Sequence, residues 1–107
     1  MSAPRLEQLL ILLKEQSEDP FILFAIAKEY EQLGQVNEAI RYYEEVLNAS
    51  EEYLGAYYHW GQLLAEQGDQ VKALEIFDKG IFMARKVGDQ HALSELLNAR
   101  INSELEL

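Results

Sequence analysis

One stretch, EQLGQVNEAIRYYEEVL at residues 31–47, decides the fold of this chain of 107 residues. Gly34 follows a segment of helical periodicity and predicts the end of a helix, because glycine adopts the left-handed backbone conformation at low cost. The apolar residues after it recur at helical spacing and predict a second helix over residues 36–49. The stretch therefore indicates two helices joined by a short turn.

The same pattern returns further along the chain. Gly34 and Gly68 are 34 residues apart, and so are Ala39 and Ala73. A period of 34 residues with two helices in each unit indicates a repeat architecture. Residues 20–53 aligned with 54–87 keep size and polarity at the apolar positions, pairing Leu23 with Tyr57, Ile26 with Trp60, Ala27 with Gly61, Tyr30 with Leu64, Ile40 with Leu74, Tyr43 with Phe77 and Leu47 with Ile81.

Turn signals divide the rest of the chain into further helices. Asp19-Pro20 is a typical helix start, Gly88 a typical helix end, and Asp89 can cap the last helix. No stretch alternates apolar and polar residues long enough to predict a strand. The sequence thus predicts an all-α fold with six helices, at 4–16, 20–33, 36–49, 51–67, 70–87 and 89–104, the fourth marked by Ser50 and the glutamates after it.

The two outer helices carry apolar stripes. In the first helix Ile11 and Leu12 widen the stripe, so we expect this helix to be covered on more than one side. In the last helix the stripe is expected to cover the open face of the second repeat. The stripe residues are Leu6, Leu9, Leu10 and Leu13 in the first helix, and Leu93, Leu96, Leu97, Ile101 and Leu105 in the last.

Residues 20–87 resemble two tandem tetratricopeptide repeats. The family's tryptophan is displaced to Trp60, and Glu51 and Arg85 stand where its closing proline is usual. The resemblance implies a right-handed superhelix of antiparallel helix pairs in one domain: an N-terminal helix at 1–19, repeats at 20–53 and 54–87, and a capping helix at 88–107. The family pattern is carried by Leu23, Ile26, Ala27, Tyr30, Gly34, Ala39, Tyr43, Val46 and Leu47, and again by Tyr57, Trp60, Gly61, Leu64, Gly68, Ala73, Phe77, Gly80 and Ile81.

Composition excludes several classes of function. The chain has 19 acidic and 9 basic residues and a formal net charge of −10, which argues against nucleic acid or an anionic membrane as partner. Without cysteine there is no disulfide, thiolate metal site or cysteine nucleophile. The apolar run at residues 9–13 is too short to span a bilayer and lacks a signal-peptide cleavage site. We therefore expect a cytoplasmic protein.

No pattern of catalytic or metal-binding residues is present. His59 and His91, the two histidines, lack metal-ligand spacing. The serines lack a nucleophile motif, and adjacent glutamates such as Glu44 and Glu45 point in different directions along a helix. The sequence therefore predicts neither an enzyme nor a cofactor.

Two aromatic residues fall outside the packing pattern. Tyr58 and Phe24 occupy equivalent places in the repeats, on the face that the family presents as its concave surface. Aromatic side chains beside polar groups on such a face are typical of a peptide groove, although Phe24 could instead be buried by the N-terminal helix. The expected groove residues are Phe24, Lys28, Glu31, Tyr58, His59, Gln62 and Glu66.

The expected partner is a protein or peptide. Some family members bind an acidic tail through a lysine and asparagine clamp, but the matching places here hold Phe24, Lys28 and His59, so most of that clamp is missing. With the acidic net charge, this favours a basic or apolar partner and a monomer that binds other proteins. The alternatives are a small regulatory subunit of a larger complex, or a self-associating unit, such as a homodimer, formed through Ile11, Leu12, Leu105 and Leu107.

Overall fold

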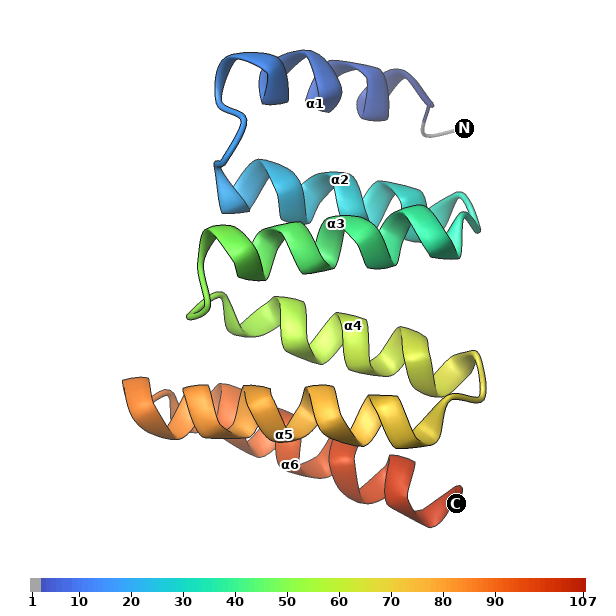
Figure 1. Cartoon of the computed structure of the whole chain (residues 1–107), viewed down its shortest axis with the longest axis vertical. Helices are drawn as coiled ribbons and strands as arrows, with labels where there is room; N and C mark the ends of the chain where they lie inside the picture. The colour runs from blue at the N-terminus through green and yellow to red at the C-terminus, as the bar shows by residue number, and fades with distance from the viewer. Residues whose placement is uncertain (1–2) are drawn as a thin grey trace. The chain divides into compact units, whose positions relative to one another are not determined.

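The computed structural model describes residues 3–107, and all regular structure in this range is helical (Figure 1). The chain forms two compact parts, Met1–Glu51 and Glu52–Leu107, each with three helices. The helices are α1 (Ala3–Glu15), α2 (Pro20–Gln32), α3 (Val36–Ala49), α4 (Leu54–Glu66), α5 (Gln70–Val87) and α6 (Gln90–Leu105). The predicted all-α repeat fold with six helices is confirmed.

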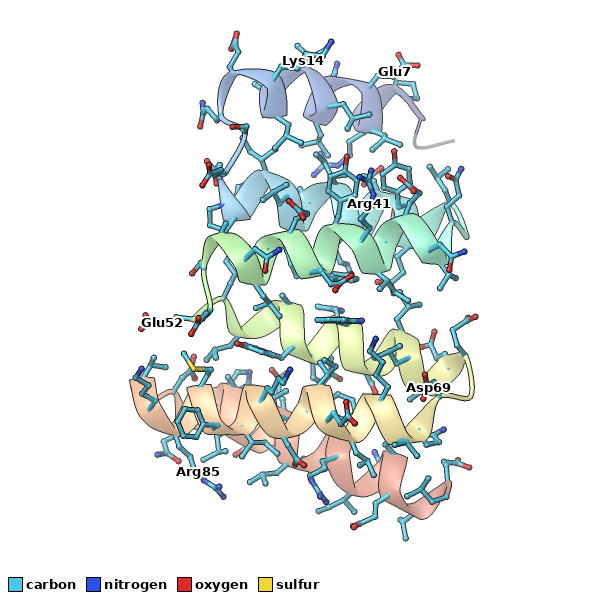
Figure 2. The ribbon with its side chains drawn as sticks, in the orientation of Figure 1. Glu7, Lys14, Arg41, Glu52, Asp69 and Arg85 are labelled. Carbon is cyan, nitrogen blue, oxygen red and sulfur yellow. The ribbon has the colours of Figure 1, made fainter. Side chains whose placement is uncertain are left out.

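Local signals set the helix ends. The carboxylate of Asp19 accepts a hydrogen bond from the backbone N–H of Phe21 at 2.9 Å, and the carboxylate of Asp89 accepts one from Ala92 at 3.0 Å. Gly34 has a φ of 75°, in the left-handed region that favours glycine, and so ends the first helix of its pair. Figure 2 shows Asp69 at the start of α5, where its side chain caps the N–H of Lys72.

The predicted start of the fourth helix is wrong by three residues. Ser50 ends α3 instead of starting α4, because its N–H donates to the carbonyl of Val46 at 2.8 Å and completes the last turn of α3. Glu51 and Glu52 then form the turn, and α4 begins at Leu54.

The first part is built on the α2–α3 pair, and α1 packs on α2. Leu6, Ile22 and Ile26 form a buried cluster between α1 and α2. Ile11 and Leu12 are 61% and 43% exposed, so the expectation that α1 is covered on more than one side is wrong. α1 buries one face only, and Glu7 and Lys14 point away from α2 (Figure 2).

The second part is built on the α4–α5 pair, which crosses closely at its glycines. A Cβ on Gly61 would lie 2.3 Å from Cε1 of Phe77, so only glycine leaves room for the ring. A Cβ on Gly80 would lie 2.7 Å from Cβ of Tyr57 and 3.1 Å from Cδ2 of Leu96. Gly61 and Gly80 therefore mark positions where α4 and α5 pack closely.

α6 covers this pair through a narrower face than predicted. Its buried residues are Leu96, Ala99 and Ser103, which lie on one helix face at spacings of three and four. Ile101 and Leu105 are 52% and 79% exposed, so the prediction that they cover the second repeat is wrong. Leu93, Leu97, Ile101 and Leu105 are four positions apart. Because an α-helix has 3.6 residues per turn, each of them lies further around the helix than the one before, and Ile101 and Leu105 lie outside the covered face.

Candidate functional site

The second part of the chain, Glu52–Leu107, contains two hollows. The first hollow lies between the N-terminal halves of α4 and α6. It encloses about 250 Å³. Leu54, Ala92 and Leu96 supply an apolar lining, while Tyr58 and His59 lie beside it on α4. The rings of Tyr58 and His59 meet edge to face, with their centroids 5.3 Å apart. Gly55 and Glu95 complete the lining.

A second hollow of about 480 Å³ lies between the C-terminal halves of the same helices. Glu66 and Glu106 contribute two carboxylates, and no lysine, arginine or histidine lines it. Its electrostatic character is therefore acidic. The remaining lining residues are Gln62, Ala65, Gln70, Asn102 and Ser103.

The two hollows follow one seam, which we call the α4–α6 groove. The first hollow is lined by the early residues of both helices and the second by their late residues, so α4 and α6 run in the same direction along it. Nε2 of Gln62 donates to the hydroxyl of Tyr58 at 3.4 Å and links the two hollows.

Hydrogen bonds order the polar end of the groove. The hydroxyl of Ser103 donates to Oε1 of Gln70, so α6 is tied to the first turn of α5. Nε2 of the same glutamine donates to the carbonyl of Ala65 at 3.2 Å and ties α5 to α4. The three helices of the second part thus meet at Gln70.

Three expected groove residues belong to the first part. Phe24, Lys28 and Glu31 lie on one face of α2 at spacings of four and three. The ring of Phe24 packs on Tyr43 of α3, with centroids 5.9 Å apart, while the α1 contact lies at Ile22 and Ile26. Phe24 is therefore half-buried by its own helix pair.

Glu31 has a structural partner. The hydroxyl of Tyr43 donates to Oε1 of Glu31 at 2.6 Å. Burial raises the pKa of Tyr43 above its ordinary value, and the hydrogen bond to the Glu31 carboxylate raises the pKa further. The tyrosine stays protonated as a donor, so Glu31 joins α2 to α3.

The structure brings Tyr58, His59, Gln62 and Glu66 together at the α4–α6 groove. None of the expected groove residues lies on α6, which forms the other wall of this groove, because α6 was expected only to cover the second repeat. α4 begins at Leu54 and α6 at Gln90, an interval of 36 residues that is close to the repeat period. That interval is the signal that could have placed α6 beside α4. The missed lining residues are Gln70, Glu95, Asn102, Ser103 and Glu106.

The chain is similar to known repeat proteins. Residues 20–53 match the sequence pattern of the tetratricopeptide repeat family. A crystal structure of a tetratricopeptide repeat domain protein from Salinibacter ruber is 34% identical, covering 80% of this chain and 97% of that chain, with a TM-score of 0.75. The chain belongs to the tetratricopeptide repeat family. No curated protein matches it in sequence.

Other tetratricopeptide-like structures share the fold over most of the chain. A protein from Bordetella parapertussis is 25% identical, covering 94% of this chain and 88% of that chain, with a TM-score of 0.81. The TPR2B domain of yeast Sti1, in a complex with pHsp70, is 16% identical and has a TM-score of 0.88 over 95% of this chain and 82% of that chain. At that identity the likeness to Sti1 shows the fold alone.

Across residues 3–107, no helix combines the length and the apolar character that crossing a lipid bilayer requires.

Proposed function

We propose that this tetratricopeptide repeat chain is a non-catalytic interaction module that binds a peptide or protein segment on the helix face that carries Tyr58 and Gln62 in the second part. The observation that supports it best is the α4–α6 groove, where an aromatic residue stands between an apolar and a polar hollow. Aromatic anchors beside a concave, partly apolar lining are typical of peptide sites.

Known structures of the same fold support this class of function. The TPR2B domain of yeast Sti1 has been solved as a complex with pHsp70. SycD from Yersinia enterocolitica, a type III secretion translocator chaperone, also shares the fold, with a TM-score of 0.83. The partner proposed here differs in chemistry from an acidic tail, because the chain carries a net charge of −10.

The test is binding to a displayed library of random dodecapeptides, followed by titration of a selected peptide against Tyr58→Ala. We expect the variant to lose about 1–3 kcal/mol of binding free energy while its melting temperature stays unchanged, since Tyr58 is only half-buried. Phe82→Ala is the matched control, because Phe82 is an exposed aromatic residue outside both hollows. The proposal is contradicted if no peptide of the library binds saturably. It is also contradicted if Tyr58→Ala binds the selected peptide normally but melts at a lower temperature.

A second candidate function is self-association. Ile11 on α1 and Ile101, Leu105 and Leu107 at the other end of the chain are more than half exposed. Apolar side chains of this size are typical of contact surfaces when they gather in a patch. Light scattering at micromolar concentration separates the two functions, because a monomer that binds peptide needs no second copy.

A further inference from the structure

We propose that the α4–α6 groove recognises an extended segment that carries one large apolar side chain and one lysine or arginine, four residues apart. The proposal rests on the function proposed above. It assigns the apolar side chain to the first hollow and the basic side chain to the second.

The first hollow fits a single apolar side chain. Its volume of about 250 Å³ exceeds that of a leucine or phenylalanine side chain but is too small for a folded element. Leu54, Ala92 and Leu96 offer apolar surface, and burying an apolar side chain against such surface is favourable. The rings of Tyr58 and His59 lie beside this surface and add contact area.

The second hollow fits a basic side chain. Glu66 and Glu106 are exposed and line it together, without a basic residue in the lining. A lysine or arginine that enters here meets two carboxylates, within a chain whose net charge is −10. An acidic side chain in the same place is repelled, so the charge at this hollow discriminates between partners.

The distance between the hollows sets the spacing of the two side chains. Tyr58 and Glu66 are eight residues apart on α4, which at 1.5 Å per residue is about 12 Å. An extended segment rises about 3.3 Å per residue and covers this distance in about four residues. Because successive side chains of an extended segment alternate in direction, a separation of four also places both side chains on the groove side. A helical segment needs about eight residues for the same distance.

The amide side chains favour the extended form. Gln62 and Asn102 line the acidic hollow beside Gln70, whose carboxamide holds the three helices together. The oxygen of Gln62 can accept hydrogen bonds, and the carboxamide of Asn102 can both donate and accept them. An extended segment leaves its main-chain N–H and C=O groups available for such partners, whereas a helix satisfies them internally. The groove is thus matched to a segment with unpaired main-chain groups.

The experiment uses the full chain and blocked glycine–serine peptides that contain one leucine and one lysine. The separation varies from one to eight residues in both orders, and affinity is measured by chemical-shift titration. We expect the tightest binding at a separation of four, at least about fivefold above separations of one or eight. Replacing the lysine by glutamate should lower the affinity about tenfold.

Two variants assign each side chain to its hollow. Glu66→Lys should weaken the leucine–lysine peptide about tenfold and favour the leucine–glutamate peptide, because the charge of the second hollow is altered. Glu44→Lys is the matched control: it makes the same charge change at an exposed position on α3. Ala92→Phe should fill the first hollow and weaken both peptides about equally, with the melting temperature measured alongside.

The outcomes separate this proposal from the function on which it rests. An optimum at eight residues, an affinity independent of spacing, or equal effects of Glu66→Lys and Glu44→Lys overturns the proposal. In that case the proposed function still stands if a peptide selected from the display library binds the wild type saturably and does not bind Tyr58→Ala. If neither the selected nor the designed peptides saturate, the proposed function itself is wrong.

Discussion

The two helix pairs, α2–α3 and α4–α5, follow the same 34-residue period but close their interiors with different chemistry. In the first pair the hydroxyl of Tyr43 donates to Glu31. At the corresponding positions the second pair has Phe77 and Ala65, whose side chains carry no polar group. The carboxylate acceptor, Glu31, is thus present only in the pair whose aromatic residue, Tyr43, has a hydroxyl group to donate.

A second position differs in the same way. Glu29 of α2 is buried, with 5% exposure, and Oε2 of its carboxylate accepts a hydrogen bond from Nε of Arg5 at 3.1 Å. Its other oxygen, Oε1, has no hydrogen-bond partner among the described residues. The corresponding residue of α4 is Leu63, which is also buried. The period therefore preserves the position of these residues, while the polarity of a side chain changes together with that of its partner.

The largest effect is expected from removing the helix that covers the second pair. Deleting residues 89–107 removes Leu96, which covers Gly80, and exposes the adjacent side chain of Tyr57. Repeat arrays need a terminal helix to cover their last apolar face, so we expect the truncated chain to aggregate or bind a hydrophobic dye. Dye fluorescence and urea unfolding check this. A soluble truncation that unfolds cooperatively would show that α6 is an appendage.

The next effect concerns the close crossing at Gly61. Gly61→Leu should lower the free energy of unfolding by about 3 kcal/mol, because even a Cβ reaches the ring of Phe77. Combining Gly61→Leu with Phe77→Ala should recover part of the lost unfolding free energy, since the smaller side chain at position 77 makes room for the leucine. If Gly61→Leu melts like the wild type, the crossing is not tight.

The hydrogen bond between Tyr43 and Glu31 gives a smaller effect. Tyr43→Phe should lower the free energy of unfolding by about 1–1.5 kcal/mol, because Glu31 loses its donor. Adding Glu31→Ala copies the Phe77–Ala65 chemistry of the second pair and should restore part of the stability. A double-mutant cycle in urea measures the coupling. Additive effects of the two substitutions would mean that the pair is not coupled.

The smallest effect should be a gain. Glu29→Leu introduces the residue that the second pair already has and removes a buried carboxylate with an unpaired oxygen. Burying a carboxylate is costly, and Arg5 stays in water without its partner because its side chain is 66% exposed, so we expect a gain of about 1 kcal/mol in unfolding free energy. Arg5→Ala in the Glu29→Leu background should then have no effect. A clear loss of stability in Glu29→Leu would show that the pair with Arg5 contributes to α1 docking.

The sequence was sufficient for those parts of the fold that depend on local chemistry. Asp19, Gly34 and Gly88 predicted helix ends correctly, because a cap or a left-handed residue acts within a few positions. Ser50 was ambiguous, because a serine after one helix and before another suits either end. Only the backbone hydrogen bond to Val46 assigns it to α3.

The parts that depend on distant contacts could not be predicted. Apolar residues occur at several angles around α6, and the side of the helix that is buried is seen only from its tertiary contacts, such as that of Leu96 with Gly80 on α5. The repeat correspondence predicted Tyr58 and Gln62 on α4. It gave no signal for Asn102 on α6, because such polar residues follow no pattern and meet α4 only after folding.

The contact of Phe77 with Gly61 also constrains how the two repeats could have diverged after duplication. If α2 were recombined into the place of α4, Ala27 would put a Cβ where Phe77 already lies within 2.3 Å. A single-helix exchange therefore creates a clash that neither parent has, whereas an exchange of the whole pair moves both partners together. The helix pair is thus the smallest unit that can be exchanged without this clash, because the residues at positions 61 and 77 have to fit each other.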